Sequence, residues 1–188
     1  MAVNDQPGGR MRLFIGIELD DDARRFAARQ AEELRGVLDG SFTDYDNYHI
    51  TLAFLGMRGE DELAALRRAM DAAARRGAFA ISMGGLGSFA KGKRQVVWLG
   101  VERTQALLDA QAALAHELRA AGIDFAGEAV YRPHITLARS CHMAELPVRR
   151  ARVGMRVERI TLFESARREG RLVYQPLYSA RLCASGHR

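Results

Sequence analysis

Two short segments of the chain each place a histidine two residues before a threonine in an otherwise apolar stretch. The segments are YHITLAFLG at residues 48–56 and PHITLARS at residues 133–140. Histidine has an unperturbed pKa of about 6.5, so it can give or take a proton at neutral pH. A threonine hydroxyl can donate a hydrogen bond to an anionic oxygen. The four residues with this chemistry are His49, Thr51, His134 and Thr136.

The spacing within each segment is the spacing of side chains on one face of a β-strand. Successive side chains in a strand point to opposite faces, so His49 and Thr51 share one face while Ile50 points to the other. The same alternation puts His134 and Thr136 together. Each segment therefore presents an imidazole beside a hydroxyl and keeps its apolar residues for a core.

A third segment, RITLFES at residues 159–165, repeats the pattern with Arg159 in place of histidine. It is an internal control, because Ile-Thr-Leu by itself is ordinary strand sequence and a single strand histidine is more often a surface residue than a catalyst. Two His-x-Thr units change this interpretation. If the halves of the chain are similar lobes whose central strands face each other, one cleft holds a paired acid and base with two hydroxyl donors.

The elements that would position these residues alternate between strands and helices, which predicts an α+β fold. Helical periodicity from residue 20 to about 38 follows a first strand, and similar stripes over residues 63–77 and 104–122 predict two more helices, the former with Arg67, Arg68, Arg75 and Arg76 on its solvated side. Residues 143–152 fit no element clearly. The predicted strands are RLFIGIEL (12–19), the first motif, FAISMGGLGSF (79–89), VVWLGV (96–101), RPHITLA (132–138), RVERITLFES (156–165) and RLVYQPLYSARL (171–182), the last two joined by a polar turn at 166–170.

Composition limits the class of protein. The chain has 188 residues, 48% of them hydrophobic, which fits one globular domain or two small lobes sharing a core. We expect residues 1–10 to be a flexible leader and residues 11–188 a single bilobal domain. No stretch approaches about 18 uninterrupted apolar residues, so we expect a soluble, cytoplasmic protein with no membrane partner. Cys141 and Cys183 lack metal or disulfide spacing and are predicted to be reduced thiols.

The net charge of +5 and the pI near 9.7 favour an anionic partner such as a nucleic acid. Only two of the 28 basic residues are lysine, so a bias in the source genome is an equally simple explanation of the charge. The residues AKGKRQ (90–95) predict a mobile basic loop, in which Lys91, Lys93 and Arg94 would track an RNA backbone or merely form a solvated hairpin tip.

From about Arg12 to Leu182, the order and spacing of these motifs resemble the 2H phosphoesterase superfamily, and within it the bacterial and archaeal RNA 2',3'-cyclic phosphodiesterases, historically called 2'-5' RNA ligases. The resemblance implies two pseudo-symmetric α+β lobes with antiparallel sheets facing a central cleft. It also implies metal-independent hydrolysis of RNA 2',3'-cyclic phosphate ends to 2'-phosphomonoester ends, with His49 as proton donor, His134 as proton acceptor and no cofactor. RNA or a nucleotide with a 2',3'-cyclic phosphate would be the ligand, and we expect a monomer.

The chemistry requires residues of these types independently of the resemblance, although either histidine can fill either role. Opening a cyclic phosphate with water needs a base for the attacking water and an acid for the departing ribose oxygen. Thr51 and Thr136 would donate to the non-bridging phosphate oxygens. Arg139 is a further phosphate ligand only if the strand ends or twists near Ser140, because strict alternation places it on the opposite face. Aromatic residues that would stack on a base, or simply belong to the core, are Phe42, Tyr45, Tyr48 and Tyr131.

Three alternatives remain at this level. Ligation to a 2'-5' linkage uses the related transesterification and the same histidines, and a basic RNA-binding module would need no chemistry at all. A metal centre would draw on His116, His142 or His187, but the chain has no His-x-His, His-Glu-x-x-His or Cys-rich cluster. We therefore expect no metal site.

Overall fold

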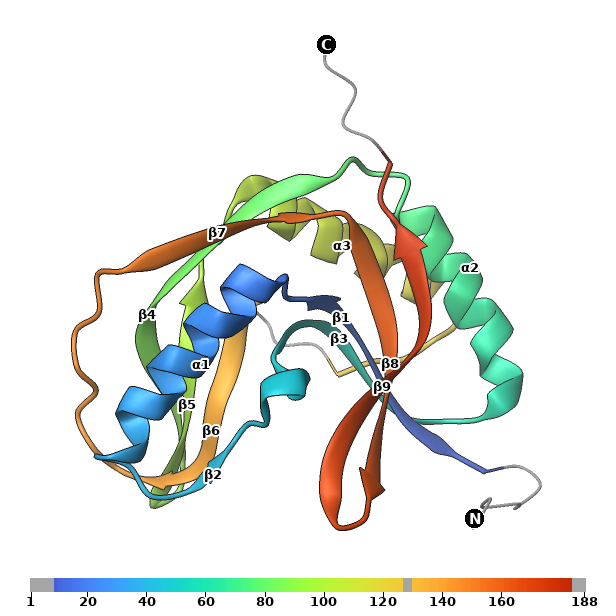
Figure 1. The fold of residues 1–188 in the computed structure, drawn as a ribbon. Coiled ribbons are helices and arrows are strands. Elements are labelled where there is room, and N and C mark those ends of the chain that lie inside the picture. The colour runs from blue at the N-terminus through green and yellow to red at the C-terminus, as the bar shows by residue number, and fades with distance from the viewer. Residues whose placement is uncertain (1–8, 127–129, 184–188) are drawn as a thin grey trace.

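The computed structural model describes residues 9–126 and 130–183 (Figure 1). Helices, strands and two short 3-10 helices (η) alternate along these residues. In chain order they are β1 (Met11–Glu18), α1 (Asp21–Arg35), β2 (Ser41–Phe42), η1 (Tyr45–Asn47), β3 (His49–Arg58), η2 (Glu60–Glu62), α2 (Leu63–Ala73), β4 (Phe79–Lys91), β5 (Arg94–Val101), α3 (Gln105–Ala120), β6 (His134–His142), β7 (Arg152–Val157), β8 (Arg159–Arg168) and β9 (Arg171–Arg181).

The strands form two sheets, and every strand pair within them is antiparallel. One sheet has the order β3-β1-β8-β9 and the other the order β2-β6-β5-β4-β7. The predicted α+β class with two antiparallel lobes is confirmed. The lobes are not the two halves of the chain, however, because the four-stranded sheet combines β1 and β3 with the last two strands.

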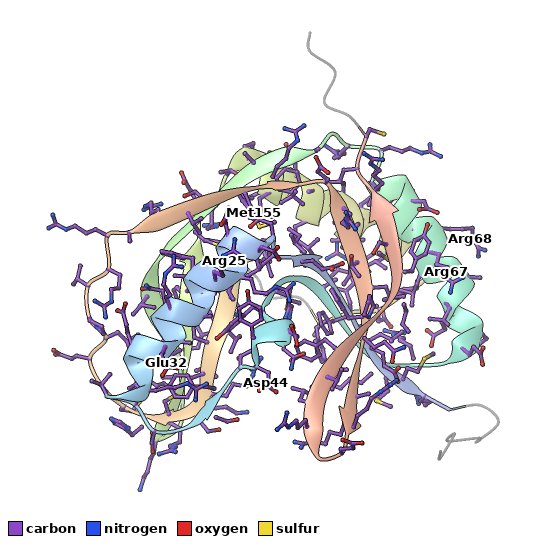
Figure 2. All side chains as sticks on the ribbon, viewed as in Figure 1. Arg25, Glu32, Asp44, Arg67, Arg68 and Met155 are labelled. Atoms are coloured by element: carbon purple, nitrogen blue, oxygen red, sulfur yellow. The ribbon has the colours of Figure 1, made fainter. Side chains whose placement is uncertain are left out.

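Each helix packs against a sheet. Helix α1 packs against β6 and β7, while α2 packs against β9 and α3 against β3 (Figure 1). Asp20 caps α1 by accepting a hydrogen bond from the Ala23 amide at 2.8 Å, as the acidic start of this helix predicts. The four arginines predicted on the solvated side of α2 and its end are exposed, and Figure 2 shows Arg67 and Arg68 at the outer edge of the molecule.

Alternation in β1 explains how one strand serves both the core and the cleft. Leu13, Ile15 and Ile17 are at most 1% exposed and belong to a hydrophobic core that runs through both lobes. Phe14 and Gly16 point to the other face of the sheet, toward the lobe interface. Strand β1 lies between β3 and β8, and its pairing with β3 positions the strand that carries His49.

One expectation about a strand and one about a loop were wrong. RVERITLFES is not one strand: it divides at Glu158, with β7 in the five-stranded sheet and β8 in the four-stranded sheet. The chain changes sheets there, and the Glu158 carbonyl accepts a hydrogen bond from the Leu182 amide at 2.8 Å. The predicted mobile loop at 90–95 is instead a two-residue turn at Gly92 and Lys93, because β4 and β5 continue to their ends in register.

Both hairpin turns contain a glycine whose φ is positive. Gly92 has φ of +62°, and the β8–β9 turn has φ of +50° at Glu169 and +79° at Gly170. In the β8–β9 turn both central residues have positive φ, which is the geometry of a type I′ hairpin turn and matches the twist of the flanking strands. The predicted polar turn at 166–170 is thus shorter than expected. Residues 143–151, which fitted no element, are irregular.

The expected leader, residues 1–10, lies outside the described residues except for residues 9 and 10. The Arg10 guanidinium donates to the Met57 carbonyl at 2.9 Å. Cys141 is buried and Cys183 exposed, and both are free thiols, as expected. None of the helices in the described residues combines the length and apolar character needed to cross a bilayer.

Candidate active site

His49 is the first residue of β3, and its ring is fixed at both nitrogens. Nδ1 lies 2.8 Å from the Asn47 carbonyl oxygen and Nε2 lies 3.1 Å from Thr51 Oγ1. A carbonyl can only accept, so Nδ1 carries the proton and donates it. In the neutral ring, Nε2 then accepts from the Thr51 hydroxyl. The first His-x-Thr pair is therefore a hydrogen-bonded unit on the cleft face of β3.

His134 repeats this arrangement as the first residue of β6. Its Nδ1 lies 2.7 Å from the Arg132 carbonyl, again the carbonyl two residues earlier in the chain. The carbonyl selects the Nδ1–H tautomer, which leaves Nε2 as the nitrogen available for proton transfer. Two histidines separated by 85 positions are thus held in the same tautomer by the same local backbone geometry.

Aromatic side chains brace each imidazole. The His49 ring lies 4.6 Å from the Phe14 ring and 4.9 Å from the Tyr174 ring, the latter edge-on at 86°. The His134 ring meets Phe89 edge-on at 82° and 5.0 Å, with Trp98 at 6.1 Å. Sequence reasoning missed all four, although the position of Phe14, on the cleft face of β1, was available from alternation alone.

Asn47 ties the first histidine to the β8–β9 hairpin. It is 6% exposed; its side-chain amide donates to the Leu172 carbonyl at 2.7 Å, and its side-chain oxygen accepts from the Tyr174 amide at 3.2 Å. The carbonyl of the same residue holds His49. Sequence analysis did not identify Asn47, because its partners lie about 125 positions later in the chain.

The two motifs meet between the sheets. Strands β3 and β6 are neighbours in space, and the Tyr131 hydroxyl, just before the second motif, donates to the Thr51 carbonyl at 2.9 Å. A cavity of about 490 Å³ reaches both Thr51 and His134. The expectation that central strands carry both motifs holds only for β6, since β3 is the edge of its sheet.

The electrostatic surroundings of His49 include residues of the second motif. Burial lowers the pKa of His49 to about 4; the hydrogen bond to Asn47 opposes this, and the positive charges of Arg139 and His134 lower the pKa further. In the free protein His49 is therefore neutral at physiological pH. The influence of Arg139 and His134 on this ring requires that the two strands bring them close to it.

A β-bulge turns Arg139 toward the site. Trp98 pairs with Thr136 but Val97 pairs with Ala138, so β6 has one extra residue at this point. Leu137 and Ala138 are both fully buried, and alternation resumes one residue out of step. Arg139 consequently joins the face of Thr136, with its guanidinium 3.5 Å from Thr136 Oγ1. Sequence analysis required the strand to end or twist near Ser140 for Arg139 to face the site, and the bulge produces this change of face just before Ser140.

The first motif also contains a β-bulge. Thr51 pairs with Gly16 and Ala53 with Ile15, which leaves an extra residue in β3 where Leu52 and Ala53 are both buried. Phe54 takes the place that Arg139 has in the second motif. The two copies therefore share their bulge as well as their His-x-Thr pair, and only the second supplies a cation.

In the third Ile-Thr-Leu segment, RITLFES, the threonine hydroxyl is already hydrogen-bonded within the protein. Thr161 is fully buried, donates to a Glu18 carboxylate oxygen at 2.6 Å and shares a hydrogen bond with Ser179 at 2.9 Å. Its hydroxyl is committed to holding three strands together. This agrees with reading Ile-Thr-Leu without histidine as ordinary strand sequence.

The other candidates have structural surroundings of their own. Tyr48 is 4% exposed in the core, Phe42 lies under the guanidinium of Arg35, and Tyr45 is exposed. Tyr131 lines the cavity and holds β3 by its hydroxyl, as described above. None of the four contacts a site histidine ring among the aromatic pairs of the described residues.

The remaining histidines are dispersed. His142 Nδ1 lies 2.8 Å from the Asp39 carboxylate, which also pairs with Arg94 at 2.8 Å, and His116 is exposed on α3. The two donors lower the pKa of Asp39 to about 2, the backbone and side-chain hydrogen bonds from His142 contributing most. His187 lies outside the described residues. Within residues 9–126 and 130–183, no three His, Cys, Asp or Glu side chains gather as metal ligands would.

Comparison with known proteins gives consistent matches. The family model of the 2'-5' RNA ligase superfamily matches residues 21–169. The chain is 32% identical over 130 residues to an RNA 2',3'-cyclic phosphodiesterase of Archaeoglobus fulgidus, covering 69% of this chain and 72% of that protein. A Thermotoga maritima protein of the same name is 32% identical over 133 residues, covering 69% and 70%.

A solved structure shows the same fold along most of the chain. The crystal structure of E. coli LigT complexed with 3'-AMP superposes with a TM-score of 0.81 at 27% identity, covering 92% of this chain and 98% of that chain. LigT has also been crystallised with ATP, and that structure superposes with a TM-score of 0.73 and covers 93% of this chain and 98% of that chain.

Proposed function

Because the chain belongs to the 2'-5' RNA ligase superfamily, we propose that it hydrolyses RNA 2',3'-cyclic phosphate ends to 2'-phosphomonoester ends without a metal ion. One observation carries the proposal: two His-x-Thr pairs, each with Nδ1 held by a backbone carbonyl, start neighbouring strands of opposite lobes. The names of the A. fulgidus and T. maritima relatives support the substrate.

The histidines divide the proton transfers between them. His134 Nε2 accepts a proton from water as the water oxygen forms a bond to phosphorus. The bond from phosphorus to the ribose 3'-oxygen breaks, and His49 Nε2 donates a proton to that oxygen. The phosphate stays on the 2'-oxygen, and each histidine ends in the protonation state in which the other began.

The threonines and Arg139 stabilise the phosphate. Thr51 and Thr136 donate to non-bridging oxygens, whose charge shifts as phosphorus becomes five-coordinate. Arg139 adds a permanent cation beside Thr136, and its planar guanidinium suits two phosphate oxygens at once. Thr51 would exchange its bond to His49 for one to the substrate.

The low pKa of His49 gives substrate binding a second role. An acid must carry a proton, yet burial keeps His49 neutral in the free protein at pH 7. An anionic phosphate favours the imidazolium form and draws the charge of Arg139 to itself, and both effects raise the pKa of His49. The substrate thereby brings about the protonation that its own cleavage requires.

The test is incubation of the purified protein with an RNA oligonucleotide ending in a 2',3'-cyclic phosphate, with and without a chelator. We expect a 2'-phosphate end in both cases, and a loss of at least about 10²-fold in turnover for His49→Ala and for His134→Ala. The matched control is His116→Ala on the exposed side of α3.

Other outcomes would identify another function. A joined product with a 2'-5' linkage when a second RNA is supplied would indicate ligation, and binding without turnover would indicate an RNA-binding module. Loss of activity with the chelator would contradict the metal-free mechanism, and full activity in either histidine variant would contradict the two-histidine mechanism.

A further inference from the structure

Each site histidine is braced by an aromatic residue from a β-hairpin, and both hairpins carry basic residues in or beside their turns. Tyr174, which contacts His49, belongs to the β8–β9 hairpin, and Phe89, which contacts His134, belongs to the β4–β5 hairpin. Figure 1 shows both hairpin tips at the same end of the molecule, at the bottom of the view. The hairpins therefore form two arms, one beside each histidine.

Strand register identifies the tip residue that faces the cleft in each arm. Tyr174 pairs with Ser165, so the next residue of β8 on the same face is Arg167. In the other arm, Lys91 lies two residues beyond Phe89 and on its face. Arg167 and Lys91 are equivalent positions, each about 7 Å along the strand from the level of the bracing aromatic.

Both cations are available to a ligand. Arg167 and Lys91 are exposed, and within the described residues neither has a carboxylate at ion-pairing distance. Arg167 donates to the Gly170 carbonyl at 3.2 Å, which uses one of its five N–H groups. Arg168, its neighbour, lies on the opposite face of the hairpin and hydrogen-bonds to Gln175.

The chemistry distinguishes the two arms. In a displacement at phosphorus, the attacking and departing oxygens lie roughly in line on opposite sides. Under the proposed function, water is on the His134 side, and the departing 3'-oxygen with its ribose is on the His49 side. A 2',3'-cyclic phosphate terminates an RNA, so the rest of the strand extends from that ribose in one direction.

We infer that the RNA strand leaves the site over the β8–β9 hairpin and that Arg167 binds a backbone phosphate on the 5' side of the terminal nucleotide. The inference rests on the proposed function and on His49 as proton donor. It makes Arg167 a determinant of preference for oligonucleotides over mononucleotides. Lys91, on the water side, has no strand to bind.

The experiment compares two substrates in low salt: adenosine 2',3'-cyclic phosphate and a short RNA ending in the same group. Arg167→Ala should lower kcat/KM for the RNA about three- to fivefold, through KM, as expected for one exposed charge contact. The mononucleotide should be cleaved at the wild-type rate. The slope of log(kcat/KM) against log salt for the RNA should decrease in magnitude by about 0.7.

Two variants control for charge alone. Arg168→Ala removes the same charge from the same hairpin on the opposite face, and Lys91→Ala removes one charge from the equivalent position of the other arm. Both should keep the wild-type ratio between the two substrates. A loss confined to Lys91→Ala would place the strand over the other arm, and equal losses in all three variants would reduce the effect to general attraction; either result overturns the inference.

A failure of the proposed function is distinguishable. If wild-type protein cleaves neither substrate, the hydrolase proposal fails, and the binding of a fluorescent RNA with a 2'-phosphate end still tests Arg167. Equal affinity of wild type and Arg167→Ala would then overturn the inference. Wild-type cleavage of both substrates with an unchanged ratio in Arg167→Ala would overturn it while leaving the hydrolase proposal intact.

Discussion

A histidine is useful for proton transfer only if the correct ring nitrogen faces the substrate. In both motifs the carbonyl two residues before the histidine makes that choice, by accepting from Nδ1 at 2.8 Å for His49 and 2.7 Å for His134. The threonine two residues later then lies beside the available face of the strand. The short His-x-Thr sequence thus acts together with the backbone that precedes it.

Removing the hydroxyls should separate the site threonines from the structural one. We expect Thr51→Val and Thr136→Val each to lower kcat by up to about 10²- to 10³-fold, the range of about 2.7 to 4 kcal/mol seen for a lost oxyanion donor. Steady-state kinetics and thermal unfolding would measure this. Thr161→Val is the matched control: it should lower stability with little effect on kcat, because it leaves the Glu18 carboxylate without its buried donor. Unchanged kcat in both site variants would make these threonines ordinary strand residues.

Arg139 should control the titration of His49. Its positive charge is one cause of the low pKa of His49, so Arg139→Ala should raise that pKa above about 4 in the free protein. NMR titration of the imidazole would measure the shift, with Arg132→Ala as the control. An unshifted or lower pKa in Arg139→Ala would show that the two side chains do not interact.

The pH profile follows from the same titration. The rate needs one histidine neutral and the other protonated, so kcat/KM, which reports the free enzyme, should be bell-shaped with its acid limb near pH 4. The bound phosphate raises both pKa values, so the bell for kcat should lie at higher pH, near neutrality. The apparent pKa values at the two limbs of the profile belong to the pair of histidines, so they do not by themselves show which histidine is the acid and which the base. A profile for kcat displaced toward lower pH would contradict the proposed effect of the phosphate.

At the scale of elements, the site depends on contacts between strands that are far apart in sequence. The β3 lead-in holds β9 through the side chain of Asn47, and β9 in turn supplies the ring of Tyr174 that lies against His49. The bulge in β6 depends on its pairing with β5, and it decides which way Arg139 faces. Position within an element is therefore set by the neighbouring element.

Loosening the Asn47 connection should affect stability and catalysis together. Asn47→Ala removes a buried side chain that makes two hydrogen bonds, so we expect a loss of about 1 to 3 kcal/mol in the free energy of unfolding. Turnover should fall as well, because the Tyr174 ring is no longer held against His49. Urea unfolding and kcat would measure the two effects. Gln105→Ala, which removes an exposed side-chain hydrogen bond on α3, is the control; wild-type kcat in Asn47→Ala would show that the brace is not needed.

At the scale of the whole molecule, the four-stranded sheet joins the first strand of the chain to the last two, while the five-stranded sheet takes its strands from the stretch between them. The last three strands join two sheets: β7 completes the five-stranded sheet, while β8 and β9 complete the four-stranded one. One hydrophobic core runs through both lobes. The two lobes should therefore fold as a unit, although the cleft divides them.

Dividing the chain within the irregular segment 143–151 tests this. Neither fragment should fold alone: the first lacks β7, β8 and β9, and the second has only those strands and no helix to cover them. Mixed together, the fragments should recover the circular dichroism spectrum and the activity of the intact protein, since the break lies outside all strands and helices. A stable fold in either fragment alone would contradict a single cooperative unit.

The sequence by itself determined the α+β class, the main strands and helices, and the sharing of a face by histidine and threonine, because these follow from periods of two and 3.6 residues along the chain. It also carried the family resemblance. Only the tertiary structure decided that β3 is an edge strand, that β7 and β8 belong to different sheets, and that Arg139 faces Thr136. These features depend on pairing between distant segments, and a one-residue bulge reverses the face of the residues that follow it until the register shifts again. The bracing by Tyr174 and Phe89 and the low pKa of His49 follow from that packing and from no local pattern.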